Sequence, residues 1–295
     1  MAPTNMILQV ASRCSCMRFV APAREAVDPA VFERPPLSDW MEFKSLLCGV
    51  DWPDIDAIEL LRDEVRSAEK GTLPRFAEQT PALLRDGLHY ESRIAERGIV
   101  ATRASNWHDL LNALIWLRYP ALKAALNARQ VEEIAQVGTK QRTRPQCALT
   151  HFDEAGIVAL VRDPALLARW DAHDWQGLFW RERDAWRDGR IAVEVFGHAL
   201  LEHALVPGQL LVGKALVVQG KVGANDDSVA RVAHAIRAGE LLNDPQELRP
   251  LPLSGIPGWH PDNADERFYF EAPCFCRVRE GRRYPTPLQS VIGAS

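Results

Sequence analysis

The clearest helical pattern in the chain runs from Asn106 to Tyr119, where apolar residues recur at intervals of three and four. Asn106 is a good N-cap residue for this helix. Pro120 fits the first turn of a second helix, which we expect over Ala121–Ala128. Short apolar clusters at helical spacing also occur across residues 40–98. The pattern therefore predicts that residues 40–128 are mostly helical.

Strand-like runs appear after this helical region. Cys147–Phe152 and Ile157–Val161 are separated by four residues that begin with Asp153 and end with Gly156. A glycine in a short connection between two such runs is typical of a β-hairpin, because glycine readily adopts a positive φ. A further strand is expected over Leu210–Gln219. These segments predict a small β-hairpin or sheet within a helical protein.

The stretch from Pro245 to the C-terminus differs from the rest of the chain. It contains eight of the 20 prolines. Proline interrupts helices and restricts the residue before it, so we expect this stretch to be an extended arm over the body. Before the arm, helices are expected over 164–188, 192–205 and Ser228–Leu242.

These elements predict an α+β fold that is mainly helical. We expect a single globular domain over residues 28–295, with a small β-hairpin or sheet and an extended proline-rich arm from about residue 245. Residues 1–27 are expected to form a flexible N-terminal extension. Pro35 and Pro36 mark the entry to the folded body.

Composition narrows the functional classes. The chain has 295 residues, of which 47% are hydrophobic and 25% charged, and its net charge is −4. These proportions are typical of a soluble globular protein and argue against disorder. The acidic balance argues against nucleic acid as a partner, and no run approaches the roughly 18–20 apolar residues that span a bilayer. We expect a cytoplasmic protein that acts on an unidentified small molecule.

The six cysteines include two Cys-x-Cys pairs, at positions 14 and 16 and at positions 274 and 276. These four thiols could in principle bind zinc. Structural zinc sites, however, usually space their cysteines as Cys-x(2–4)-Cys. We therefore interpret the cysteines as reduced thiols, as is usual in the cytoplasm.

The first candidate site residues lie at the start of the clearest helix. His108 and Asn112 are four residues apart and share a helix face, so His108 could bind a metal while Asn112 orients a substrate or water. Asp109 adds a carboxylate beside this histidine. The alternative is purely structural, because Asn106 and Asp109 also suit a capped helix start.

Two further segments combine the residue types that bind divalent ions. His198 and Glu202 are four apart and project together from a predicted helix, although such pairs also arise as surface contacts. Asp153 and Glu154 lie in the predicted hairpin turn, where aspartate also occurs for structural reasons. Imidazoles and carboxylates together suit zinc or another divalent ion.

Other signals are weaker. His151 and the Pro257–Asn263 loop, which contains His260, also place histidine near carboxylates. A basic loop over Lys140–Arg144 suits phosphate, and nucleic-acid binding there would weaken steeply with salt. The chain has no phosphate-binding loop, no dinucleotide-binding glycine motif and no nucleophile elbow, so no nucleotide cofactor is expected.

Four blocks of sequence resemble an uncharacterised bacterial family that is known only as a domain of unknown function. They are N-W-H-D-L-x-N-A-L from residue 106, F-D-E-x-G from 152, G-H-A-x-x-E from 197 and P-G-W from 257. The resemblance covers roughly residues 28–290. It implies a soluble bacterial protein and carries no activity. The motif positions it matches are Asn106, His108, Asp109, Asn112, Asp153, Glu154, His198 and Glu202.

We therefore predict a hydrolase that depends on a divalent metal, Zn²⁺ or Mn²⁺/Mg²⁺, and acts on a phosphoester or an amide. The predicted metal ligands are His108, Asp109, Asp153 and His198. The predicted catalytic residues are Glu154 and Glu202 as candidate general bases, and Asn106 and Asn112 as groups that orient the substrate. The alternative is a non-catalytic binding or regulatory protein in which these residues form a structural polar network. An open cleft would favour the enzyme, and dry interior pairs would favour the network.

Overall fold

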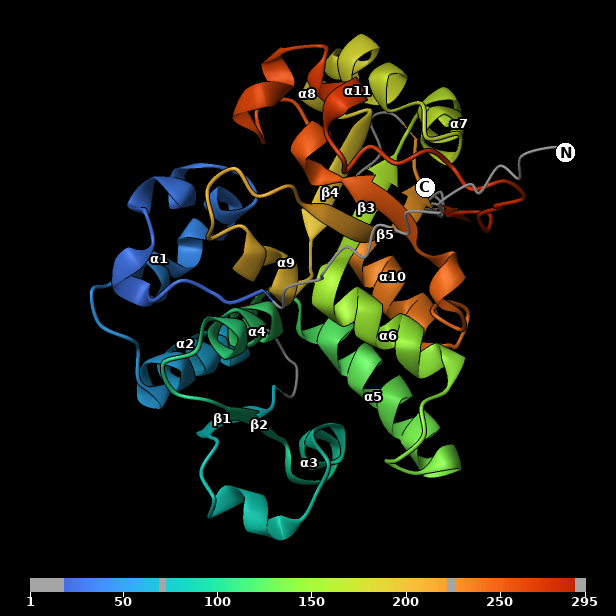
Figure 1. Cartoon of the computed structure of the whole chain (residues 1–295). Coiled ribbons are helices and arrows are strands. Elements are labelled where there is room, and N and C mark those ends of the chain that lie inside the picture. The colour runs from blue at the N-terminus through green and yellow to red at the C-terminus, as the bar shows by residue number, and fades with distance from the viewer. Residues whose placement is uncertain (1–18, 69–72, 222–226, 290–295) are drawn as a thin grey trace, which may run out of the picture.

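The structure is a computed structural model that describes residues 19–68, 73–221 and 227–289. Helices account for most of these residues, and the strands form two small sheets (Figure 1). The prediction of a mainly helical α+β fold is confirmed. The two predicted thiols at positions 14 and 16 lie outside the described residues.

The larger sheet lies at the centre of the molecule. Its strands are β3 (Gly156–Val161), β4 (Ile191–Val195), β5 (Val212–Gln219), β6 (Arg249–Pro252) and β7 (Leu288–Gln289). The order is β4-β3-β5-β6, with β7 also paired to β5. β3 is parallel to β5 and antiparallel to β4, while β6 is antiparallel to β5. Every residue of β3 is buried, as expected for an apolar central strand that is covered on both faces.

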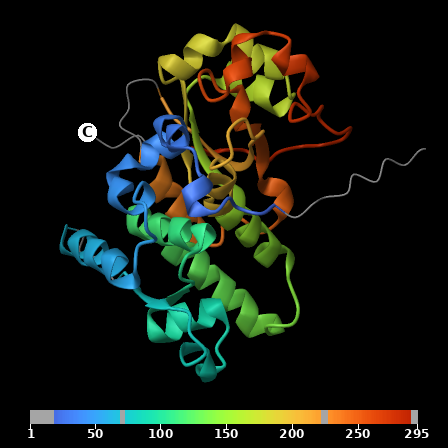
Figure 2. The same ribbon diagram turned by 60° about the vertical axis from the view of Figure 1, so that its left-hand side comes forward.

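The smaller sheet belongs to a separate lobe. Strands β1 (Arg75–Glu78) and β2 (Ile99–Thr102) are parallel and are connected through helix α3 (Tyr90–Arg97). This lobe lies at one end of the molecule, and α7, α8 and α11 lie at the other end in both views (Figures 1 and 2). Because α3 packs on the long helix α5, the lobe adjoins the helical layer rather than the central sheet.

The remaining helices connect and cover the sheets. They are α1 (Lys44–Leu47), α2 (Ile55–Ala68), α4 (Trp107–Arg118), α5 (Pro120–Val137), α6 (Arg144–Ala155), α7 (Pro164–Asp171), α8 (Arg183–Arg187), α9 (His198–His203), α10 (Ser228–Arg237) and α11 (Phe268–Glu271). Short 3₁₀ segments occur at Arg24–Ala26, Pro29–Glu33, Leu37–Phe43, Leu83–Asp86, Pro245–Glu247, Leu253–Gly255 and Pro261–Ala264, and a π-helical segment at Gln176–Arg181. None of the described helices is both long and apolar enough to cross a membrane.

Helix α4 begins and ends as the sequence predicts. The Asn106 side chain accepts a hydrogen bond from the Asp109 N–H at 3.0 Å, which caps the helix. Leu111, Leu114 and other apolar residues of α4 are fully buried, so this helix runs through the core. Pro120 opens α5, which continues nine residues beyond the predicted end at Ala128. Both predicted helices are confirmed.

The predicted hairpin is wrong. Cys147–Phe152 belongs to helix α6, and only its second half, Ile157–Val161, is a strand. The reason is a capping box, in which the Thr143 side chain accepts from the Gln146 N–H and the Gln146 side chain accepts from the Thr143 N–H. Asp153 and Glu154 therefore lie in the last turn of a helix rather than in a β-turn.

The predicted helices over 164–188 and 192–205 are also partly wrong. The first is divided among α7, the π-helical segment and α8, and the second begins as strand β4 before it becomes α9. Gly197 separates β4 from α9, and its N–H donates to the Gly156 carbonyl at 2.9 Å. The strand over 210–219 is confirmed from Val212 onward, and α10 ends at Arg237, five residues before the predicted end.

The helices of the C-terminal arm are short, as its prolines predict. The arm does not only cover the body but also contributes a strand to it. Residues 249–252 form strand β6 of the central sheet, and Leu251 is fully buried. At the other end, residues 1–18 of the predicted extension lie outside the described residues. Residues 19–27 lie against the body, where the buried Arg24 side chain donates hydrogen bonds to the carbonyls of Leu46, Leu47 and Gly49.

Candidate metal centre

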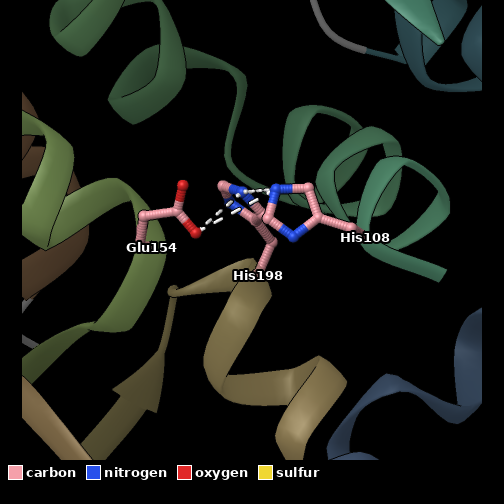
Figure 3. A group of neighbouring side chains, drawn as sticks. All are labelled: His108, Glu154 and His198. Carbon is pink, nitrogen blue, oxygen red and sulfur yellow. Dashed lines mark hydrogen bonds and ion pairs between the residues drawn. The ribbon is translucent and has the colours of Figure 1, made fainter. Parts of the chain in front are cut away.

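Three side chains from three different helices meet beside the central sheet. His108 lies in the first turn of α4, Glu154 in the last turn of α6, and His198 is the first residue of α9. Helix α9 packs on both α4 and α6, and this brings the three helix ends together. In Figure 3 the two imidazole rings and the Glu154 carboxylate point toward one another.

The distances among these groups suit a shared metal ion. The Nε2 atoms of His108 and His198 are 3.0 Å apart, and Glu154 Oε2 lies 3.6 Å from His198 Nε2 and 4.0 Å from His108 Nε2. Ligands bound tetrahedrally at about 2.0–2.2 Å lie roughly 3.3 Å from one another. The three atoms could therefore hold one metal ion.

A close backbone contact sets the position of two of these ligands. The N–H groups of Phe196 and Gly197 both donate to the Gly156 carbonyl at 2.9 Å. A Cβ atom at position 197 would lie only 2.4 Å from the Ala155 Cα and 2.5 Å from the Gly156 nitrogen. Because Glu154 and His198 flank this contact in the chain, the absence of a side chain at Gly197 lets the ends of α6 and β4 approach.

Glu202 orients His108 from the other side. Its Oε2 lies 3.1 Å from His108 Nδ1, and the hydrogen bond raises the pKa of His108 above its usual value. Nδ1 donates to this carboxylate, and the 3.0 Å contact between the two Nε2 atoms is itself a hydrogen bond, to which one of the two rings supplies the proton. Release of that proton would free the Nε2 lone pairs that face Glu154 for a metal ion. A carboxylate behind a histidine ligand is a common arrangement in metal sites.

His198 is held in the neutral form. It is only 4% exposed, and burial lowers its pKa to about 3. Its Nδ1 is buried and has no hydrogen-bond partner among the described residues. A neutral imidazole with a free lone pair is the form that binds metals. Burial also raises the pKa of Glu154, although the nearby His108 opposes this effect.

The three groups line an open pocket of about 370 Å³. The pocket extends from them across the faces of α3, α4 and α5 and reaches the α5–α6 loop, so that Tyr90, Glu91, Gln130 and Arg142 also line it. The half-buried carboxyl of Glu91 has its pKa raised to about 7 by burial. The candidate metal centre is therefore accessible to a small molecule.

Asp153, next to Glu154 in the chain, has a different role. Its Oδ1 accepts from the Lys123 ammonium at 2.6 Å, and the same ammonium donates to Asn112 Oδ1 at 2.8 Å. The Asn112 amide in turn donates to the Tyr90 hydroxyl at 2.9 Å. Burial alone would raise the pKa of Asp153, but the charge of Lys123 lowers it. These four side chains form a continuous polar chain, of which Tyr90, Asn112 and Asp153 line the pocket.

The carboxylate of Asp109 is also paired with a cation, Arg103. Its two carboxylate oxygens accept from the guanidinium of Arg103 at 2.7 and 3.0 Å, and one also accepts from the Arg103 N–H at 2.6 Å. The Asp109 backbone N–H bonds to the cap residue Asn106. The helix start therefore has its Asn106 cap, while the Asp109 carboxylate is paired with Arg103 at the wall of the pocket.

The structure thus brings some of the predicted site residues together and places others outside the group. It brings His108, His198 and Glu154 together, with Glu202 directly behind His108. Glu154 lies among the potential ligands, although we predicted it as a general base. The predicted ligands Asp109 and Asp153 lie outside this group, because Arg103 and Lys123 engage their carboxylates. Among the predicted orienting residues, Asn106 caps α4 and Asn112 belongs to the polar chain.

Sequence reasoning missed three residues of this region, Tyr90, Glu91 and Lys123. No motif distinguishes them, because each resembles an ordinary helix residue in the sequence. Of the weaker signals, His151 is exposed on α6, whereas the His260 side chain accepts from the Asp262 N–H and stacks on Phe268. Neither lines the pocket.

Fold and site together define a helical α+β protein with a His-His-Glu group at the end of an open polar pocket. A family model described as "Protein of unknown function (DUF3025)" matches residues 74–279. The chain belongs to this family, which confirms the resemblance to a domain of unknown function. The matched segment includes every candidate site residue. No curated protein and no solved structure matches the chain.

Proposed function

We propose that the protein is a hydrolase that uses one divalent metal ion bound by His108, Glu154 and His198. The observation that carries this proposal is the geometry of the three ligand atoms, which lie 3.0 to 4.0 Å from one another at the wall of an open pocket. Three protein ligands leave a coordination position for water or substrate, which is the arrangement of catalytic rather than structural metal sites.

The donor set favours zinc over magnesium or manganese. Two imidazole nitrogens and one carboxylate oxygen form a recurring catalytic zinc set, whereas magnesium prefers oxygen ligands. A zinc ion there would lower the pKa of coordinated water toward 7 and polarise a carbonyl or phosphoryl oxygen.

The surrounding charges also favour a dication. Among the described residues, the carboxylates of Glu154, Glu202, Asp153 and Asp109 have two lysine or arginine partners, Lys123 and Arg103. Even with His108 protonated, as its raised pKa favours, these groups carry one excess negative charge, and a divalent ion that displaces the proton would balance it. Glu202 would hold His108 in the tautomer that leaves Nε2 free, and His198 is already neutral through burial.

The main alternative is the structural network predicted beside the enzyme. Its strongest support is the polar chain of Lys123, Asp153, Asn112 and Tyr90, which is a network of this kind. Tyr90, Asn112 and Asp153 of this chain line the same pocket of about 370 Å³ as the His-His-Glu group. The His-His-Glu group differs in its carboxylate, because Glu154 faces two imidazoles whereas Asp153 is paired with Lys123.

The proposal is tested by hydrolysis of a generic phosphomonoester, p-nitrophenyl phosphate, and a generic amide, a p-nitroanilide. The protein is assayed after zinc loading and after chelation. We expect chelation to abolish the activity and His198→Ala to lower it at least about 100-fold, as loss of an essential metal requires. Turnover that persists equally in the chelated protein and in His198→Ala would contradict the proposal.

His203→Ala is the matched control for His198→Ala. His203 lies on the same short helix but packs against Phe19, with ring centroids 4.0 Å apart, and belongs neither to the metal group nor to the pocket. We expect this variant to keep its metal and its activity. Equal losses in both histidine variants would indicate damage to α9 rather than removal of a ligand.

A further inference from the structure

The wall of the pocket beyond the metal group is almost entirely polar. Among the described residues that line the pocket, Ala101 and Ile134 are the aliphatic ones, and the remainder are mainly glutamine, threonine and histidine side chains, two arginines and four carboxylates. Of these carboxylates, Asp109 and Asp153 are paired with Arg103 and Lys123. Pockets for apolar ligands are lined mainly by hydrophobic and aromatic side chains. This wall instead suits a small ligand that is rich in hydrogen-bonding groups.

The polar chain of Lys123, Asp153, Asn112 and Tyr90 leaves one donor without a partner among the described residues. Lysine can only donate, so the contact between Lys123 and Asn112 Oδ1 assigns the orientation of the Asn112 amide. The amide nitrogen must then donate to the Tyr90 oxygen, and the Tyr90 hydroxyl proton needs a different acceptor. The described residues offer it none, and Tyr90 lines the pocket. Burial raises the pKa of Tyr90, so the hydroxyl stays protonated.

Two arginines supply positive charge along the same wall. Arg142 is exposed, lines the pocket, and makes no ion pair or hydrogen bond with the described part of the chain. Arg103 is held by Asp109 through its Nε and Nη2 atoms, which leaves Nη1 without a described partner. Arginine is the residue best suited to bind oxyanions through several N–H groups at once.

We propose that Tyr90, Arg103 and Arg142 bind a phosphoryl group, so that the substrate of the hydrolase is a phosphoester and not an amide. This inference rests on the proposed function. A phosphomonoester offers three non-bridging oxygens to these three donors and to the metal. The neutral carbonyl of an amide needs neither arginine.

The reaction balances without any further reactant. The oxygen of water forms a new bond to phosphorus, the ester P–O bond breaks, and one proton of the water passes to the leaving alcohol. Tyr90, Arg103 and Arg142 would bind the negatively charged oxygens before and after this exchange. Inorganic phosphate, the product, is therefore a suitable probe for the subsite.

The test measures phosphate binding by isothermal titration calorimetry, with the protein as purified and without free metal in the buffer. The metal content of the same sample is measured in parallel. We expect Arg142→Gln to weaken phosphate binding by at least about tenfold, because a charge-assisted contact is lost. Tyr90→Phe should weaken it by about three- to tenfold, as expected for one neutral hydrogen bond.

Lys140→Gln is the matched control, because Lys140 is an exposed cation of the same loop that does not line the pocket. We expect it to change the affinity for phosphate by less than about twofold. Acetate, a carboxylate of lower charge, should bind at least about tenfold more weakly than phosphate.

Three results would overturn the phosphoryl subsite: no phosphate binding at millimolar concentration, equal effects of Arg142→Gln and Lys140→Gln, or equal affinity for acetate and phosphate. These failures are distinct from failure of the metal site. A sample that contains metal but does not bind phosphate contradicts only the subsite. A sample that binds phosphate through Arg142 but never acquires metal contradicts only the proposed hydrolase.

Discussion

Asp153 and Glu154 are adjacent in the chain, but they lie in two different electrostatic environments. Asp153 contacts the buried ammonium of Lys123 at 2.6 Å, which lowers its pKa against the effect of burial. Glu154 faces His108 and His198 at the edge of an open pocket, and burial raises its pKa. A helix turns about 100° per residue, so neighbouring carboxylates point to different surroundings.

The difference separates a structural carboxylate from one that is available to a ligand. The charge of Asp153 is already balanced by Lys123. If Asp153 bound a ligand instead, the buried Lys123 ammonium would be left unpaired. Glu154 has imidazoles opposite it: burial lowers the pKa of His198 to about 3 and keeps this ring neutral, so among the two rings His108 alone can supply a positive charge. A metal ion would provide that charge. Five variants, one of them a double substitution, break or sharpen this contrast.

The largest effect on stability is expected from Lys123→Met. The Lys123 side chain is 4% exposed and the Asp153 side chain 23% exposed, so the substitution leaves Asp153 charged and largely buried. Removal of one partner from such a pair costs about 3–5 kcal/mol. We expect urea unfolding to show a loss in this range. Lys140→Met, on an exposed loop, should be neutral within about 0.5 kcal/mol.

The double variant Lys123→Met/Asp153→Leu tests the cause of that loss. Because it removes both charges, it should recover at least half of the lost free energy of unfolding. If Lys123→Met alone costs less than about 1 kcal/mol, the polar chain does not have the structural role that we assign to it.

Gly197→Ala should disturb the site through the backbone. Its Cβ would lie 2.4 Å from the Ala155 Cα, so α6 and β4 must move apart. We expect a loss of about 1–3 kcal/mol in the free energy of unfolding, as is typical of overpacking, and weaker metal binding because Glu154 and His198 separate. Gly49→Ala is the control, since its Cβ would make only ordinary contacts of 3.5 Å and longer.

Glu202→Gln should weaken zinc binding while leaving the fold intact. The amide cannot supply the negative charge that Glu202 places 3.1 Å from His108 Nδ1. Loss of such a partner typically lowers metal affinity about 10–100-fold. Competition with a chromogenic zinc chelator would measure the change. The exposed Glu240 provides the control substitution, Glu240→Gln, for which an unchanged affinity is expected.

The effect of Glu91 depends on pH. Burial raises the pKa of this carboxyl from 4.5 to about 7, so it favours the folded state most below pH 4.5 and loses that contribution as the pH rises through about 7. Glu91→Gln should therefore match the wild-type stability near pH 4.5 and exceed it at pH 8, by about 3 kcal/mol if the whole shift is expressed. Thermal unfolding across this range would measure the difference, and a constant offset would contradict the assignment.

The sequence predicted well those elements that are specified locally. Helix α4 has a cap at Asn106 and a long apolar face, and both signals lie within the helix itself. Helix α6 was missed because its apolar run and Gly156 resemble one arm of a hairpin. Its capping box at Thr143 and Gln146 was the local signal that could have identified it.

The site was predictable only in part, for a related reason. His108 and His198 were identified because each has a carboxylate nearby in the sequence. Sequence proximity could not show that Lys123, 30 residues before Asp153, binds that carboxylate, because the contact depends on how α5 packs against α6. In the sequence Lys123 resembles any lysine of a helix surface. The division between ligand and structural carboxylates therefore required the tertiary structure.

The most direct test of the metal centre is zinc stoichiometry by elemental mass spectrometry of the tag-free protein, together with His108→Ala, His198→Ala and Glu154→Ala. The account predicts about one zinc per chain in the wild type and its loss in all three variants, whereas Asp153→Asn and Asp109→Asn retain the metal. Absence of zinc from the wild-type protein after zinc loading, or its retention in both histidine variants, would contradict the central claim.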